Sequence, residues 1–346
     1  MRGAAYGHGL TCTNDCRQRR YRLGVLIVAV VGPTATGKSD LALDLAQALS
    51  PAGGPPAEIV NADAYQLYTG MDIGSAKVPV AQRRGIVHHQ LDVLDVSEDA
   101  SVARYQAEGR ADLEAIAARG ARGIVVGGSG LYLRALLDDM TFPGTDPAVR
   151  AALEGRAERE GTRALFTELE RSDPAAALSI GPKNTRRIVR ALEVIEITGA
   201  PFTANLPRQE YVRPAVQIGL DCDRDVLDRR VEERVERMWE EGLVEEVRTL
   251  SARGLGRTAS RAVGYAEVLA YLAGEITQEQ ARADVTANTR RLARKQMGWF
   301  GRDPRVTWLA AGSPTLLDDA LAVTRAADAG PAPAPGTDPV RRSLGS

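Results

Sequence analysis

Apolar and polar positions along the chain follow two different periods, and together they predict a mixed α/β fold. Short continuous apolar runs, which are typical of buried strands, lie at Val25–Val31, Ile59–Asn61, Gly123–Val126 and Val216–Leu220. Apolar residues with helical spacing lie between them, at Asp40–Leu49 and Tyr105–Arg119. Strands that alternate with helices usually form a parallel sheet with helices on both faces, and we expect this architecture for the core.

The alternation stops between residues 147 and 200, where helical patterns follow one another without a convincing strand. These helical stretches are Ala148–Arg159, Arg163–Glu170 and Asn184–Ile197. Beyond them the pattern predicts a long charged helix and two more helices, at Asp225–Arg248, Ala262–Leu272 and Glu279–Phe300. We therefore expect an α/β core with C-terminal helices at 23–142 and 183–311, interrupted by a helical insertion at 143–182.

Both ends of the chain lack such periodicity. Residues 1–22 hold five arginines and two of the three cysteines, and we expect a disordered extension there. The spacing of His8, Cys12 and Cys16 admits a metal site, although such a site needs a rigid frame with further ligands. From about Gly312 the chain is rich in alanine, proline and aspartate, which predicts a short helix and then a mostly disordered tail over 312–346.

The arginine-rich segment before the apolar run Leu23–Val31 has the outline of a signal peptide. No small-residue cleavage site follows, however, and nine apolar residues are far fewer than the about 20 that span a bilayer. The run is better interpreted as a buried strand that leads into a loop. Three cysteines in 346 residues also agree with a reducing compartment, so we expect a cytoplasmic protein without a membrane partner.

The composition is that of an ordinary globular protein, with 44% hydrophobic and 26% charged residues. It excludes a chain that is disordered throughout, and the low cysteine content excludes a disulfide scaffold. Lys and Arg together number 44 against 45 Asp and Glu, for a formal net charge of −1. Taken as a whole, this balance argues against a nucleic-acid partner, which usually requires a basic surface.

The positions of the charges change that picture. Two stretches contain basic residues and no acidic ones; they hold Lys183, Arg186, Arg187 and Arg190, and then Arg290, Arg291, Arg294, Lys295 and Arg302. The compensating charge is concentrated in Asp225–Glu246, which has nine acidic residues against four arginines. A single basic run is usually a solvated helix face. Two such clusters in a chain of near-zero net charge favour an anionic polymer as partner.

The first predicted strand leads into a complete Walker A pattern, which is typical of nucleotide-binding and ATP-binding proteins. It consists of Gly32, Pro33, Thr34, Ala35, Thr36, Gly37, Lys38 and Ser39, followed by a predicted helix. In such a loop the glycines permit the turn, backbone N–H groups and the lysine bind phosphates, and the serine hydroxyl can ligate Mg²⁺. The pattern predicts a P-loop NTPase-like core that binds a di- or triphosphate, but it does not identify the reaction.

Two further segments follow predicted strands at the same edge of the sheet. Asp63 comes just after the second strand, where a carboxylate could ligate Mg²⁺, act as a general base or cap the next turn. Gly127–Gly130 could bring backbone N–H groups and the Ser129 hydroxyl close to an anion. His88 and His89 are adjacent and would point to opposite faces of a strand, so we interpret them as structural residues.

Taken together, these motifs resemble the tRNA dimethylallyltransferase family, whose members prenylate N6 of the adenosine 3′ to the anticodon. The resemblance extends from about Val25 to Trp308 and rests on motifs in a fixed order. They are GPTATGKS, DAYQLYTGMDIGSAK (Asp63–Lys77), HHQLD (His88–Asp92), GGSGLYLRALL (Gly127–Leu137), VGY (Val263–Tyr265) and TRRLARKQMGWF (Thr289–Phe300). The family implies transfer from dimethylallyl diphosphate to tRNAs that read codons starting with U, with Mg²⁺ as cofactor.

The resemblance also implies roles for individual residues. Asp63 would be the general base, Lys38 and Ser129 would assist catalysis, and the phosphate loop would hold the diphosphate with Mg²⁺ on Ser39. Arg230 and Arg234 are candidates for additional contacts to the leaving group. The implied tRNA contacts are Asp63, Ala64, Tyr65, Gln66, Ser129, Arg150, Lys183, Arg186, Arg187, Arg261, Gly264, Tyr265, Arg290, Arg294 and Lys295. Ala266 departs from the pattern, because many relatives carry a basic residue there.

Three other functions share parts of this pattern. Adenylate isopentenyltransferase performs the same chemistry on free AMP, ADP or ATP, but would not need the helical insertion or the basic clusters. A P-loop nucleotide kinase would need a lid with clustered arginines, which Lys183–Arg190 matches weakly. A GTPase-like switch would need a guanine-recognition motif of the Asn-Lys-x-Asp type, and the sequence has none. We expect the anticodon stem-loop of tRNA and dimethylallyl diphosphate as partners of a monomeric enzyme.

Overall fold

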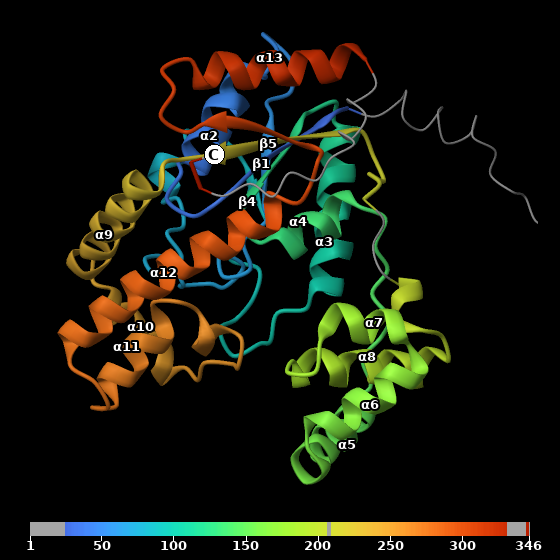
Figure 1. Ribbon diagram of the computed structural model, residues 1–346. Coiled ribbons are helices and arrows are strands. Elements are labelled where there is room, and N and C mark those ends of the chain that lie inside the picture. Colours follow the sequence, from blue (N-terminus) through green and yellow to red (C-terminus); the bar gives the residue numbers. More distant parts are fainter. Residues whose placement is uncertain (1–24, 206–208, 331–343, 346) are drawn as a thin grey trace, which may run out of the picture. The chain divides into compact units, whose positions relative to one another are not determined.

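The computed structural model describes residues 25–205, 209–330 and 344–345, and Figure 1 shows its helices and strands. The predicted extension at 1–22, with His8, Cys12 and Cys16, lies outside the described residues, as does most of the chain after residue 330. The chain divides into two compact units, and each is considered by itself. The larger unit runs up to Leu137 and resumes at Tyr211, and the smaller unit is Asp138–Glu210.

The larger unit is built on a parallel sheet that has six strands among the described residues, in the order β3-β2-β4-β1-β5-β6. The strands are β1 (Ile27–Val31), β2 (Glu58–Asn61), β3 (His88–His89), β4 (Gly123–Gly127), β5 (Ala215–Asp221) and β6 (Val306–Ala310). The four strands predicted from the sequence are the central ones. The edge strands were not predicted, because β3 has two residues and β6 is buried only at Val306, so neither forms a continuous apolar run.

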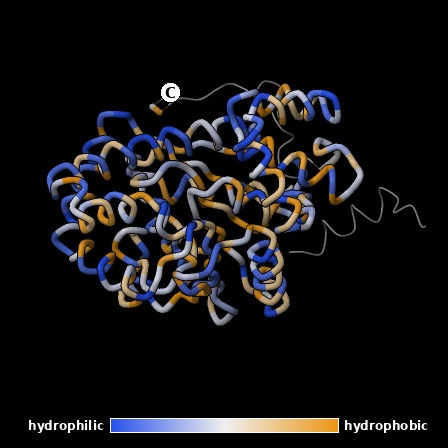
Figure 2. The backbone as a smooth tube through the Cα atoms, turned by 90° about the horizontal axis from the view of Figure 1, so that it is seen from below, coloured by the Kyte–Doolittle hydropathy of each residue, from blue (hydrophilic) through white to orange (hydrophobic). Residues whose placement is uncertain are grey.

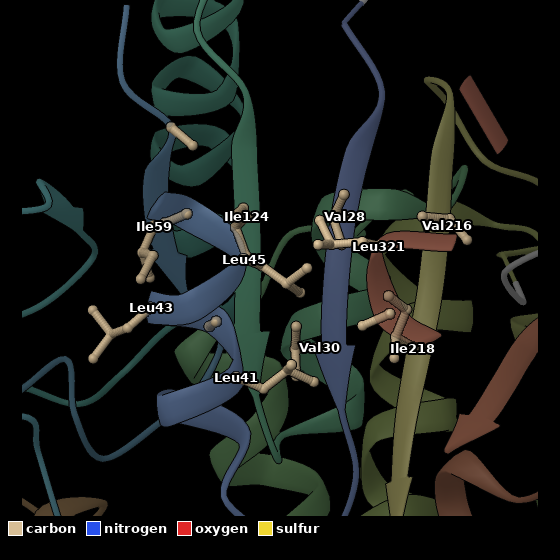
Figure 3. Close-up of a cluster of buried hydrophobic side chains, with 14 of the residues drawn as sticks. Val28, Val30, Leu41, Leu43, Leu45, Ile59, Ile124, Val216, Ile218 and Leu321 are labelled. Atoms are coloured by element: carbon tan, nitrogen blue, oxygen red, sulfur yellow. The ribbon is translucent and has the colours of Figure 1, made fainter. Parts of the chain in front are cut away.

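Helices cover both faces of this sheet, as the alternating pattern predicted. They are α2 (Lys38–Ala48), α3 (Val102–Ala118), α4 (Gly130–Leu137), α9 (Arg224–Glu240), α10 (Leu243–Ala252), α11 (Tyr265–Leu272), α12 (Gln278–Phe300) and α13 (Leu316–Ala329). Leu45 of α2 and Leu321 of α13 share one hydrophobic cluster with Ile124 of β4 (Figure 3). At the preceding strand position, a Cβ on Gly123 would lie 2.7 Å from Leu113 Cδ2 of α3. Because neighbouring strand residues face opposite sides, α2 and α13 lie on one face of the sheet and α3 on the other.

The hydropathy of the chain agrees with this layering. Strands β1 and β4 consist of apolar residues and glycine, whereas hydrophobic and hydrophilic residues alternate along the helices (Figure 2). Val28, Val30, Ile124 and Ile218 are each completely buried. Within the described part of the chain, no helix is both long and apolar enough to cross a membrane.

One prediction for the C-terminal half needs correction. The single helix expected at Asp225–Arg248 is two helices, because Gly242 adopts φ 99° and interrupts the helical backbone between α9 and α10. The short helix expected after Gly312 is present as α13. Its Ala320 and Leu321 are buried in the cluster that α2 shares with the sheet, and this burial stabilises the helix.

The smaller unit is the helical insertion, but with other boundaries than predicted. Its helices are α5 (Pro147–Glu160), α6 (Thr162–Ser172), α7 (Pro174–Ile180) and α8 (Thr185–Thr198). The expected insertion, 143–182, leaves out α8 and assigns it to the core. The structure contradicts this, because Ile188 and Leu192 of α8 are buried against Leu165 and Leu169 of α6.

A buried carboxylate joins two helices of this unit. Glu193 of α8 is completely buried and pairs with Arg150 of α5 at 2.6 Å and with Arg190 at 2.9 Å. Burial acts to raise the pKa of Glu193, but the hydrogen bonds from the two arginines outweigh it and hold the pKa below its usual value. The carboxylate is therefore ionised, and its two arginines are committed to an internal ion pair.

We predict that Glu193→Gln lowers the free energy of unfolding by about 3 kcal/mol, the order found when one partner of a buried ion pair is removed. Chemical unfolding of the full chain measures the change. The control is Glu160→Gln, which removes an exposed partner of Arg156 and should leave stability unchanged within error. Equal stability of the two variants would contradict the structural role of Glu193.

Candidate active site

The phosphate loop connects the end of β1 to the start of α2. Ala35 and Gly37 both adopt positive φ angles, of 64° and 86°, and the Thr36 hydroxyl donates to the Pro33 carbonyl at 2.9 Å. A Cβ on Gly32 would lie 2.7 Å from the Leu220 carbonyl oxygen, so this position has no room for a side chain. The loop is thus tightly wound, and the N-terminus of α2 provides the anion-binding environment that the sequence predicted.

Two partly buried cations lie at this loop. Lys38 Nζ donates to the Pro33 carbonyl at 2.5 Å, and Arg234 of α9 donates to Thr34 Oγ1 at 3.0 Å. Burial, followed by the charge of Arg234, lowers the pKa of Lys38 to about 7, although the charge of Asp63 opposes the shift. Burial also lowers the pKa of Arg234. The two desolvated cations favour binding of an anion at this loop, because the negative charge would compensate the cost of removing both cations from water.

Arg230, the other arginine expected at the phosphates, lies one turn earlier on α9. Its guanidinium contacts the Cys222 thiol at 4.0 Å. Cys222 shares a hydrophobic cluster with Ala35 of the phosphate loop, so Arg230 lies near the loop, while Arg234 bonds to it directly.

Asp63 follows β2, and its backbone is held by a side chain that the sequence did not single out. Asn61 Oδ1 accepts a hydrogen bond from the Asp63 N–H at 3.0 Å, and its Nδ2 donates to the carbonyl oxygens of Asp63 and Gln90, both at 2.9 Å. The Tyr105 hydroxyl donates to the Asn61 carbonyl at 2.7 Å. The only signal in the sequence for this role was the position of Asn61 at the carboxyl end of a strand.

The Asp63 carboxyl group has an environment suited to proton transfer. Burial raises its pKa, while the backbone N–H of Tyr65, at 3.0 Å from Oδ1, and the charge of Lys38 act in the opposite direction. A carboxylate with a raised pKa holds a proton more readily than an exposed one does. Asp63 can therefore serve as a base beside the phosphate loop.

Ser129 lies beside the Asp63 segment. Its N–H donates to the Ala62 carbonyl, and its hydroxyl accepts from the Ala64 N–H, both at 3.2 Å. Gln66, at the end of this segment, donates to the Ser75 carbonyl at 3.1 Å. The structure thus brings together Lys38, Asp63 and Ser129, which the sequence proposed as the catalytic residues.

The fourth element of the site is α12, whose buried face the sequence did not identify. Gln296 Oε1 accepts a hydrogen bond from the Thr34 N–H at 2.8 Å. Trp299 lies against Gly130, where a Cβ would be 1.9 Å from the indole Nε1. Spacing alone could not show these contacts, because they join segments far apart in the sequence.

Several residues expected to contact RNA have internal partners. Arg150 is held by Glu193, and Arg290 pairs with Glu232 and Asp228 of α9. Tyr265 is completely buried, and its hydroxyl donates to Glu246 at 2.5 Å. These three side chains therefore stabilise the fold, a role that residue type alone did not indicate in the sequence.

Other members of the predicted RNA-binding set are exposed. Arg294 and Lys295 lie on the exposed side of α12, and Arg261 is exposed just before α11. Lys183, Arg186 and Arg187 are exposed at the start of α8 in the smaller unit. Gly264 has φ 94° and precedes Tyr265 at the first turn of α11.

No group of three or more His, Cys, Asp or Glu residues that could hold a metal is found in the described ranges. Ser39 lines a small cavity of about 20 Å³, together with Asn61, Gln66 and His88. The rest of its lining is apolar and consists of Ile59, Val78, Leu91 and Val126. A larger groove of about 440 Å³ between α9 and α12 includes no residue of the phosphate loop, and it is lined by charged residues that pair with one another, such as Arg282 with Glu236.

Comparison with known proteins gives a consistent result. Residues 66–303 match the model of the IPP transferase family. The chain is 58% identical over 289 residues to a tRNA dimethylallyltransferase of Kineococcus radiotolerans, covering 83% of this chain and 91% of the relative. It is 56% identical to the tRNA dimethylallyltransferase of Thermobifida fusca, covering 86% of this chain and 93% of that one.

Solved structures show the same likeness. A tRNA isopentenylpyrophosphate transferase of Bacillus halodurans superimposes with a TM-score of 0.63 at 36% identity, over 88% of this chain and 96% of that chain. A eukaryotic dimethylallyltransferase acting on tRNA gives a TM-score of 0.73 at 25% identity, over 87% of this chain and 77% of that chain.

The lowered pKa of Lys38 generates a prediction for anion binding. Protonated Lys38 attracts an anion, and the charge is lost as the pH rises through about 7. We expect the affinity of the free protein for inorganic diphosphate to fall about tenfold between pH 6 and 8, as measured by calorimetry. Lys38→Arg stays charged in this range and corrects for ionisation of the ligand itself. The same pH dependence in both proteins would show that Lys38 does not titrate there.

Proposed function

Because the chain belongs to the IPP transferase family and is a prenyl-transferring enzyme of the tRNA dimethylallyltransferase type, we propose that it transfers a dimethylallyl group from dimethylallyl diphosphate to a tRNA adenosine. The acceptor is N6 of the adenosine 3′ to the anticodon, in tRNAs that read codons starting with U. The observation that carries this proposal is the position of Asp63 beside Lys38 and the phosphate loop, which puts a base next to a diphosphate site.

The reaction needs a stabilised leaving group and an oriented nucleophile. The loop amides, Lys38 and Arg234 bind the diphosphate, and they stabilise the charge that develops on it as the carbon–oxygen bond breaks. The N6 lone pair forms the new bond to the allylic carbon, and Asp63 accepts the proton from the amine. The Ser129 hydroxyl, fixed beside Ala64, lies on the acceptor side of the site.

We include Mg²⁺ in this proposal, with Ser39 as its protein ligand. The ion would neutralise charge on the diphosphate, and phosphate oxygens and water would complete its coordination. A single hydroxyl is enough from the protein because the substrate brings most of the oxygen ligands.

The adenine must leave its stack to reach the carboxylate of Asp63, as in other enzymes that modify nucleobases. We propose that exposed cations bind the phosphates of the anticodon stem-loop, and that residues around Asp63 contact the base. The proposed RNA-binding side chains are Asp63, Ala64, Tyr65, Gln66, Ser129, Lys183, Arg186, Arg187, Arg261, Arg294 and Lys295. We also propose a monomer that acts in the cytoplasm, since three cysteines in 346 residues suit a reducing compartment.

The other functions considered from the sequence are less well supported. Relatives that are 52–58% identical over most of this chain bear the name tRNA dimethylallyltransferase. This identity favours tRNA over free adenine nucleotides as the acceptor, and prenyl transfer over phosphoryl transfer.

Asp63→Asn should slow prenyl transfer by about 10²–10⁴-fold, because the amide cannot accept the proton at the same position. Affinity for unmodified tRNA should change little, because the side chain keeps its size. A turnover assay beside filter binding measures both, with the exposed Asp318→Asn on α13 as control. Equal loss of binding and turnover would contradict the role of Asp63 as the base.

Arg294→Ala combined with Lys295→Ala should weaken tRNA binding and reduce the slope of log affinity against log salt by about 1–2. Filter binding over a range of salt concentrations gives this slope. Arg325→Ala is the control, since it removes an exposed arginine from another helix, α13, which has none of the proposed RNA-binding residues. An unchanged slope in the double variant would show that these two cations are exposed to solvent but do not contact RNA phosphates.

A further inference from the structure

One buried side chain lies between the two glycine-rich loops of the site. Gln296 is only 8% exposed, although it comes from α12, far from either loop in the sequence. Its Oε1 accepts the Thr34 N–H of the phosphate loop at 2.8 Å. On the other side, a Cβ on Gly128 would lie 2.2 Å from Gln296 Nε2. The amide group of Gln296 thus fills the space between Thr34 and Gly128.

The orientation of this amide follows from its partner. The Thr34 N–H can only donate, so the side-chain atom that faces it must be the oxygen. Nε2 is therefore the atom turned toward Gly128, and the glycine is needed because any side chain would displace it. Trp299, three residues later on the same helix face, packs against Gly130 in the same way. Figure 1 shows α12 beside α4, the helix that begins at this second loop.

The two loops carry the two halves of the reaction. The phosphate loop holds Lys38, and the Gly128–Ser129 loop is hydrogen-bonded to Ala62 and Ala64, the residues on either side of Asp63. A change in the spacing between the loops would change the distance between the allylic carbon and the attacking amine. Errors of about 1 Å in such a distance can cost about 10²-fold in rate.

We propose that Gln296 is a positioning residue that sets the spacing between the phosphate loop and the Asp63–Ser129 side of the site. The inference rests on the proposed prenyl transfer. Without Gln296 the allylic diphosphate still ionises, since Lys38 and Arg234 remain, but the amine is no longer held in line with it. Water then captures the allylic carbon, giving dimethylallyl alcohol, diphosphate and a proton in place of prenylated RNA.

The test compares diphosphate released with prenyl groups transferred to unmodified tRNA, using labelled dimethylallyl diphosphate. Gln296→Met keeps the length of the side chain and removes the hydrogen bond to Thr34. Gln296→Asn, one methylene shorter, is the second variant in case the first does not fold. The matched control is Gln217→Met, which replaces another buried glutamine, on β5, whose Nε2 donates to the Tyr211 hydroxyl.

Wild type and Gln217→Met should release diphosphate and transfer prenyl groups in equal amounts. The Gln296 variants should transfer about 10–100-fold more slowly and release at least about twice as much diphosphate as they transfer prenyl groups. Slower transfer with equal release and transfer would overturn the proposal, because a merely structural defect slows both together. Unchanged transfer would overturn it as well. A wild-type protein that prenylates no tRNA would instead overturn the proposed function, and this inference with it.

Discussion

The parallel arrangement of three neighbouring strands is the constraint on which the site depends. β2, β4 and β1 lie side by side, and their register pairs Asn61 with Val126 and Val31 with Gly127, so the strands end level with one another. Because parallel strands present their carboxyl ends at one edge, the segments that follow them meet there. The base, the second glycine-rich loop and the phosphate loop are therefore neighbours in space although about 25 residues or more separate them in sequence.

Burial gives these neighbours their chemistry. The same desolvation that lowers the pKa of Lys38 raises that of Asp63, so the site holds charges that are costly without a substrate. A bound diphosphate would compensate the cations, and a proton from the amine would neutralise the carboxylate.

The surface charges fall into two groups. Some arginines, such as Arg150 and Arg290, are held by internal acids, whereas Arg294 and Lys295 remain exposed. The net charge of −1 averages over these groups and therefore says little about the partner.

The sequence predicted the central strands, the phosphate loop and the residues that meet at its edge, because these depend on local patterns of apolar residues and glycines. It did not predict the roles of Asn61 and Gln296, since a hydrogen bond to Asp63 or Thr34 depends on the folded backbone. It also assigned Tyr265 to the RNA surface, although this side chain is buried against Gly74 and bonded to Glu246. The predicted boundaries of the helical insertion were wrong, because tertiary packing determines them. Helix α8 belongs to the helical unit because its apolar face packs against α6.

The proposed reaction joins a dimethylallyl group to a tRNA adenosine at this site. The most direct measurement incubates the protein with labelled dimethylallyl diphosphate and unmodified tRNA, digests the RNA, and locates the label by mass spectrometry. We expect label on N6 of the adenosine 3′ to the anticodon and on no other nucleoside. Label on free adenine nucleotides with none in tRNA, or transfer of phosphate from labelled ATP to a mononucleotide in its place, would contradict it.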